Sequence, residues 1–194
     1  MITHIDGVLE EKNPAFAVID VNGVGYILHI SLNTYSALPE KGRVRLFTHL
    51  SIREDAHTLF GFATKEERVM YRHLISVSGV GPSTARMVLS GMTASECASA
   101  IVSEDIATFK GVKGIGAKTA ERVIVDLKDK VDGELVSVDN LSSSGNTIKN
   151  EALTALVVLG IDKKRAEKIV GDAIKKGGDD LTVEDLVKLT LKSL

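Results

Sequence analysis

The chain has 194 residues, enough for one to three small domains, and 44% of them are hydrophobic, enough to fill a core in each. One cysteine, Cys97, excludes an intrachain disulfide framework and a cysteine-based zinc site, and it favours a reducing, cytoplasmic compartment. A net charge of −2 excludes a strong positive field, and 4% aromatic residues disfavour base stacking as the main mode of nucleic-acid binding. No signal peptide or apolar run of about 18 residues is visible, so we expect no membrane partner.

The first 62 residues predict a small β-barrel. Short strand-like segments cover residues 2–10, 17–21, 26–30, 43–52 and 58–62. Asn22-Gly23 between the second and third segments is a hairpin signal, and the turn-rich stretch 31–42 has room for one helical turn. Five short strands in about 60 residues are typical of an OB-type barrel. The last two strands enclose a charged hairpin tip that contains Glu54 and Asp55, which on its own reads as a solvated turn.

Residues 63–132 predict helices. Thr64 with Glu67, and Thr93 with Glu96, each have the spacing of a capping box, in which two side chains satisfy each other's backbone N–H groups at a helix start. Another helix is expected to begin in the stretch 103–106. This region holds ten Lys and Arg against nine Asp and Glu, so binding of an anion must depend on local groups rather than on overall charge.

The same region contains a repeated motif. Gly79-Val80-Gly81 recurs 35 residues later as Gly114-Ile115-Gly116, and Ala85 recurs as Ala120. Each copy predicts a helix-hairpin-helix: the glycines permit positive φ and close approach of a phosphate, the central apolar residue fills the angle between the helices, and the alanine allows tight packing. The turn opens a helix whose free N–H groups and positive dipole end suit an anion. Two such turns suit the two backbones of one duplex, without reading base sequence.

Other motifs in the chain do not reach the pattern that their chemistry requires. The stretch 111–119 resembles a P-loop, but Ala117 separates the last glycine from Lys118 and no strand precedes it, so we expect no nucleotide hydrolysis. The turns lack the third glycine of a dinucleotide site. The five histidines have no metal-ligand spacing, and Asp126 reads as a solvated helical residue rather than a catalytic carboxylate. We therefore predict no cofactor, no metal and no catalytic residue.

The remaining residues predict a linker and a small bundle. Residues 133–147 are rich in small polar side chains and predict a flexible linker. Helices are expected over 149–159, over 163–176 and from the cap Thr182 onward, as a three-helix bundle within residues 148–194. The predicted fold is thus a multidomain α+β chain, with an OB-type barrel (1–62), a tandem helix-hairpin-helix domain (63–132), a linker (133–147) and a bundle (148–194).

In this order, the parts resemble the RuvA family, the bacterial Holliday-junction binding subunits of a branch-migration complex, over the whole chain. The residues that carry the resemblance lie at 53–55, 59–62, 78–82, 89–91 and 114–122. The resemblance implies a non-enzymatic homotetramer, or an octamer on DNA, that holds a four-way junction open and square for recombination and repair. It also implies a hexameric ATPase partner, RuvB, and a resolvase, RuvC.

The resemblance further implies roles for individual residues. Glu54 and Asp55 would form an acidic pin at the tetramer centre. The phosphate-binding residues would be those of the two turns and two nearby cations: Gly79, Val80, Gly81, Gly114, Ile115, Gly116, Lys118 and Arg122. Leu156, Leu159 and Ile161 would dock the ATPase, although bundle core is an alternative, above all for Leu156. The chain departs from the family at Ser83 and Ala117, where relatives often carry lysine.

Two other functions fit the helix-hairpin-helix pair. One is the DNA-binding subunit of a structure-specific nuclease or repair enzyme, which the absence of an acidic cluster in the sequence disfavours. The other is an oligomer that never contacts DNA.

Overall fold

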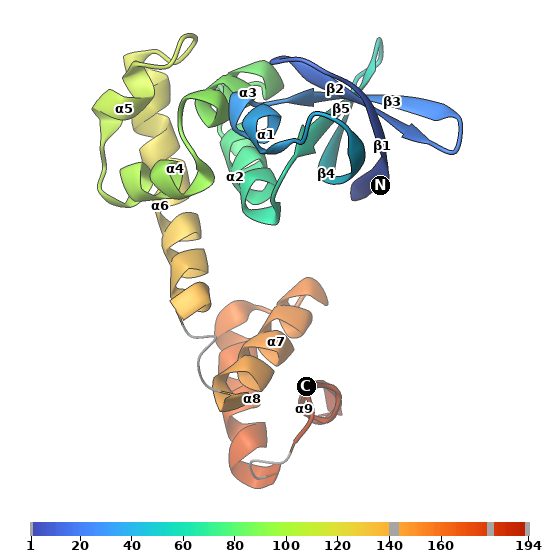
Figure 1. The fold of residues 1–194 in the computed structure, drawn as a ribbon. Helices are drawn as coiled ribbons and strands as arrows, with labels where there is room; N and C mark the ends of the chain where they lie inside the picture. The colour runs from blue at the N-terminus through green and yellow to red at the C-terminus, as the bar shows by residue number, and fades with distance from the viewer. Residues whose placement is uncertain (1, 140–143, 178–180, 193–194) are drawn as a thin grey trace. The chain divides into compact units, whose positions relative to one another are not determined.

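The computed structural model describes residues 2–139, 144–177 and 181–192. It divides into two compact units, Met1–Asp132 and Gly133–Leu194 (Figure 1). None of the helices within the described ranges is both long and apolar enough to cross a membrane.

The first unit begins with a closed barrel of five strands, β1 (His4–Lys12), β2 (Phe16–Val21), β3 (Val24–Ile30), β4 (Gly42–Ile52) and β5 (His57–Phe62). They pair in the order β1-β2-β3-β5-β4, and β4 closes the barrel on β1. Only β3 and β5 pair in parallel, and the short helix α1 (Leu32–Ala37) lies between β3 and β4 in the chain. This topology confirms the OB-type barrel. Alternate residues of the strands fill its core, among them Ile19, Leu28 and Leu46.

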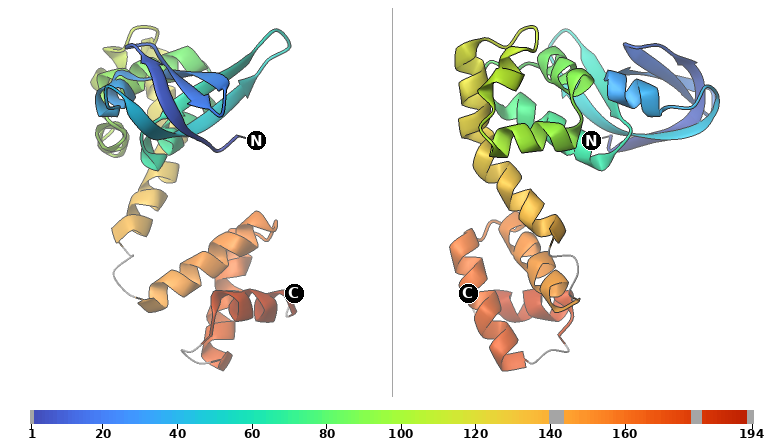
Figure 2. Two further views of the ribbon diagram at one scale, coloured as in Figure 1. Left: turned by 45° about the vertical axis from the view of Figure 1, so that its right-hand side comes forward. Right: turned by 60° about the vertical axis from the view of Figure 1, so that its left-hand side comes forward.

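The helices that follow lie beside the barrel, and the first of them packs against β4 and β5 (Figures 1 and 2). They are α2 (Lys65–Ser76), α3 (Pro82–Gly91), α4 (Ala94–Val102), α5 (Ile106–Lys110) and α6 (Ala117–Asp139). Phe60 and Phe62 of β5 belong to the same core as Tyr71 of α2, with ring centroids 5.2 and 4.8 Å from that of Tyr71. The end of β5 thus joins the core of the helices, while the rest of the barrel keeps its own core, and both lie in the unit that ends at Asp132.

One of the two expected capping boxes forms. At α4 the Thr93 hydroxyl accepts from the Glu96 N–H, while the Glu96 carboxylate accepts from the Thr93 N–H at 2.7 Å. At α2, Thr64 does cap the Glu67 N–H, but the Glu67 side chain does not return the bond. It is buried and accepts from the hydroxyls of Ser31 and Thr34, the latter at 2.6 Å. The prediction of a reciprocal box at Thr64 is wrong, because α1 supplies nearer donors to Glu67.

The second unit holds the helices α7 (Ser144–Val158), α8 (Lys163–Gly177) and α9 (Val183–Lys192). A small core joins them, with Ala152, Leu156, Val170 and Leu186 buried. The three predicted helices of the bundle are thus present, and Thr182 caps α9 by accepting from the Asp185 N–H. In the predicted linker, residues 133–139 continue α6 and α7 already begins at Ser144, whereas residues 140–143 lie outside the described part of the chain.

Candidate nucleic-acid interface

The first hairpin connects α2 to α3. Its turn is closed by the Val80 N–H, which donates to the Val77 carbonyl at 3.0 Å. Gly79 has φ of +95°, a value that side chains rarely adopt, so glycine is required there. Gly81 is extended, with φ of −85° and ψ of 169°, and it caps α3 without a side-chain hydrogen bond. The exposed start of α3 therefore presents backbone N–H groups that no capping side chain occupies.

The second hairpin repeats this geometry 35 residues later, between α5 and α6. The Ile115 N–H donates to the Val112 carbonyl at 3.0 Å, and Gly114 has φ of +93°. Gly116 is not in the positive-φ region, as Gly81 is not. Of the two glycines that permit positive φ in each turn, the first adopts it and bends the chain, and the second leaves open space. A Cβ atom on Gly81 or Gly116 would have no heavy atom within 4 Å apart from those of its neighbours in the chain.

The two hairpins pack on each other reciprocally. A Cβ atom built on Gly79 would lie 3.4 Å from the Thr119 hydroxyl oxygen, and one built on Gly114 would lie 3.7 Å from that of Thr84. Thr84 and Thr119 are related by the same 35-residue offset as the glycines. Each turn thus rests on the first turn of the helix that belongs to the other hairpin. This contact holds the two helix starts at a fixed separation. The sequence analysis did not predict the contact, although the offset of 35 residues also relates the two threonines.

The apolar residues of the motif behave as predicted. Val80 and Ile115 are 5% and 6% exposed, and Ala85 and Ala120 are fully buried. Because these side chains point into the core, Val80 and Ile115 have only their backbone groups to offer a ligand.

The two predicted cations lie at the second hairpin. Lys118 is exposed in the first turn of α6. Arg122 is exposed one turn further on, and its guanidinium donates a long hydrogen bond, 3.5 Å, to the carbonyl of Ser78 in the first hairpin. Arg122 thus extends across the space between the turns. In the described residues no group of three or more His, Cys, Asp or Glu side chains is arranged to hold a metal ion.

Glu54 and Asp55 lie in the turn between β4 and β5, as predicted. The Arg53 N–H donates to the Ala56 carbonyl at 2.9 Å and closes this turn, and residues 53–56, hereafter the tip, are all exposed. The hairpin that carries the tip extends away from the barrel (Figure 2, left). The two carboxylates differ in surroundings, because Asp55 lines a cavity and Glu54 does not.

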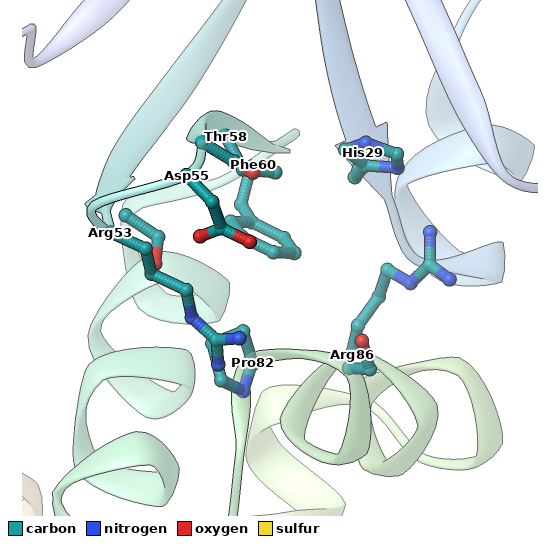
Figure 3. A pocket seen from close by; sticks show the side chains of 10 residues that line it. His29, Arg53, Asp55, Thr58, Phe60, Pro82 and Arg86 are labelled. Carbon is teal, nitrogen blue, oxygen red and sulfur yellow. The ribbon is translucent and has the colours of Figure 1, made fainter.

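This tip cavity, of about 260 Å³, lies between the tip, the barrel and the start of α3. Figure 3 shows Asp55 directed into it, with Arg53 on one side and His29 and Arg86 on the other. Phe60 and Ser83 also line it. The Arg86 guanidinium donates to the Ala15 carbonyl at 2.9 Å, and burial, with the nearby charge of Arg86, lowers the pKa of His29. Sequence reasoning did not find the cavity, since His29 and Arg86 are far apart in the chain.

The three residues predicted to dock a partner lie at the end of α7, with different exposure. Leu156 is fully buried in the bundle core, Leu159 is 61% exposed and Ile161 is half-buried. Gly160, with φ of +90°, ends the helix, and the Ile161 N–H donates to the Leu156 carbonyl at 3.0 Å. Of the three, Leu159 is the side chain available to a partner.

Comparison with known proteins agrees with this geometry. Residues 1–61 match the family model for the RuvA N-terminal domain, and residues 71–129 match that for a SAM-like helix-hairpin-helix tandem. The chain is 53% identical to the Holliday junction branch migration complex subunit RuvA of Christiangramia forsetii, with both chains covered completely. It is 51% identical to the protein of that description from Flavobacterium psychrophilum, again over both full lengths, and 49% identical to that of Cytophaga hutchinsonii over 99% of each chain.

An OB barrel fused to two reciprocally packed helix-hairpin-helix turns defines a DNA-binding protein. Within that class, the matched models and the full-length identities show that the chain belongs to the RuvA family.

Proposed function

We propose that this protein binds four-way DNA junctions without sequence preference and serves as the DNA-binding subunit of a branch-migration complex. The pair of reciprocally packed hairpins carries this proposal. Their open helix starts form two phosphate sites at a fixed separation, and backbone N–H groups recognise phosphates rather than bases. The printed descriptions of the full-length relatives supply the particular DNA structure and the branch-migration complex.

The phosphate contacts are assigned to the turns and to two side chains. The backbone of Gly79 to Gly81 and of Gly114 to Gly116 binds the anion, while Lys118 and Arg122 add charge. Pro82, the first residue of α3, has no N–H group, whereas Ala117, the first of α6, has one. The second hairpin therefore offers one more donor, and Lys118 stands beside it. Ser83 of the first hairpin adds no charge at the position where the second hairpin has Lys118, and Ala117 adds none to the second. With its extra N–H donor and Lys118, the second hairpin should contribute more of the affinity than the first.

The protein has a supporting rather than a catalytic role in this proposal. It binds the junction and recruits the RuvB motor, while any cutting belongs to a resolvase such as RuvC. Incubating the pure protein with Mg²⁺ and an end-labelled junction should leave all four strands intact. Strand cleavage that follows the protein through purification would favour the nuclease alternative instead.

Glu54 and Asp55 form the acidic pin in this proposal. In a homotetramer the four tips meet at one axis, and their carboxylates repel phosphates at the crossover, where like charges about 4 Å apart cost roughly 1 kcal/mol in bulk water and more where water is excluded. Glu54→Gln with Asp55→Asn should tighten duplex binding and reduce the preference for junctions, most clearly at low salt. An unchanged preference at low and high salt would leave the tip as a solvated turn.

The bundle serves as the docking unit for RuvB, with Leu159 as its exposed apolar contact. A fragment that ends at residue 142 should bind junctions like the full chain and fail to stimulate the ATPase or migration. Leu159→Ser should have the same selective effect, because the side chain is mostly exposed and its loss spares the core. The matched control is Val157→Ser, an exposed apolar residue two positions earlier. Normal migration by the fragment would refute the docking role.

A further inference from the structure

The tip cavity holds a combination of groups that the binding of phosphates does not use. It brings together one carboxylate, two guanidinium groups and two rings from separate elements: the tip, β3, β5 and α3. The rings of His29 and Phe60 lie 5.8 Å apart, centre to centre, with their planes inclined by 41°. Polar groups thus line a space that also has ring surface (Figure 3).

We propose that this cavity binds a single unpaired nucleobase of a strand that crosses the junction. The inference rests on the proposed function, because it places the crossover at the tip. Bases at a crossover lose part of their stacking when strands exchange, and an unstacked base costs least to turn out of a duplex. The cavity lies beside Asp55 of the tip and beside Pro82 and Ser83 at the start of α3, so a strand held by the first hairpin passes its entrance.

The chemistry of the cavity fits a base better than a phosphate. Asp55 points inward, and a carboxylate repels an anion but accepts from the exocyclic amine of cytosine or adenine. Arg53 and Arg86 provide donors for the ring nitrogen and carbonyl acceptors of a base. Unpaired bases are characteristically held between rings or guanidinium planes and hydrogen-bonded at their edges. At pH 7 His29 is neutral, since its pKa is lowered, and a neutral ring adds stacking surface without charge.

The size of the cavity also limits the ligand. Its volume of about 260 Å³ falls just below the roughly 300 Å³ at which sites for drug-sized molecules begin. A space of this size accommodates one base. Because Asp55 lines the cavity and Glu54 does not, the inference separates the two tip carboxylates: Asp55 contacts the base, whereas Glu54 acts only through its charge.

Glu54→Ala and Asp55→Ala form a matched pair for the test, because each removes one exposed carboxylate from the same turn. The full chain is mixed with four-way junctions that carry 2-aminopurine either beside the crossover or in the middle of an arm. The fluorescence of this base rises when it leaves the stack. A dye at the end of an arm reports binding separately, by anisotropy. In the wild type we expect emission to rise at the crossover and not in the arm.

Asp55→Ala and His29→Ala should reduce the extruded fraction about fivefold or more, which corresponds to the lower end of one base-stacking contact, roughly 1 kcal/mol. Glu54→Ala should retain the rise. If His29→Ala lowers the melting temperature, the test rests on Asp55→Ala, because the Asp55 side chain is exposed. A bound junction with a silent crossover, or an equal loss of emission in Asp55→Ala and Glu54→Ala, would overturn the inference. Absence of junction binding would instead refute the proposed function.

Discussion

Valine substitutions at Gly79 and Gly81 separate the two tasks of the first hairpin. At Gly79, φ of +95° strains any β-branched residue, while its Cβ would only reach van der Waals contact with Thr119 at 3.4 Å. Such strain costs roughly 1–3 kcal/mol. At Gly81, φ of −85° suits valine, the residue before a proline favours this extended region, and the space around it is open. Valine at Gly81 is a poorer helix cap, which lowers the free energy of unfolding, but it also reduces the entropy of the unfolded chain, which raises it. The two contributions nearly cancel, to within about 1 kcal/mol.

Gly81→Val should therefore fold normally and bind DNA poorly. Its side chain fills the space that a phosphate needs, and loss of one charge-assisted hydrogen bond, about 1.5–3 kcal/mol, weakens binding by roughly 10- to 100-fold. Gly79→Val should lose stability as well, with a melting temperature lower by roughly 3–10 °C. Anisotropy titration of a labelled junction and thermal melting measure the two effects. If Gly81→Val binds like the wild type, or loses binding only as far as it loses folded protein, the phosphate site is misplaced.

Three further predictions concern charge, a buried carboxylate and pH. Lys118→Gln should lower the slope of log K against log salt by roughly 0.9, equally for all DNA sequences, and Lys41→Gln on the barrel should leave it unchanged. Glu67→Ala should lower the free energy of unfolding of the first unit in urea by roughly 2–4 kcal/mol, because the buried hydroxyls of Ser31 and Thr34 lose their acceptor. The exposed control Glu66→Ala should change this free energy by less than about 0.5 kcal/mol. The pKa of His49 is lowered by burial and then by Arg72, so the unfolded chain takes up a proton first as pH falls below about 6.5, and stability decreases there. His49→Gln should remove part of this decrease, since His29, whose pKa is also lowered, contributes the rest. Exposed His57→Gln should leave the decrease unchanged, and an unchanged pH profile in His49→Gln would contradict the assignment.

Much of the fold was predictable because its signals are local. The strands of the barrel can be recognised from their own residue composition, and the repeat at 35 residues is visible without a structure. Asn22-Gly23 forms the predicted turn, with φ of 52° and 86°. The two capping patterns show where local reasoning ends. Thr64 with Glu67 and Thr93 with Glu96 have the same spacing, yet Glu67 bonds to α1, which lies more than 30 residues earlier.

The site was predictable only in part, for the same reason. The glycines of the two turns follow from their spacing, but the contact of Gly79 with Thr119 and of Gly114 with Thr84 depends on how the two hairpins pack. The tip cavity depends on β3, the tip and α3 meeting in space. Leu156 and Leu159 are both apolar and near one helix end, and only the bundle shows that the first is core and the second is exposed.

The central proposal is preference for a four-way junction through two phosphate-binding hairpins. The most direct measurement is a competition titration, at fixed salt and without Mg²⁺, of a four-way junction against a linear duplex built from the same arm sequences. We expect the wild type to bind the junction at least about tenfold more tightly, a difference of about 1.4 kcal/mol. Gly81→Val combined with Gly116→Val should abolish that binding without unfolding the chain. Equal affinity of the wild type for junction and duplex, or junction binding that survives both substitutions, would contradict the proposal.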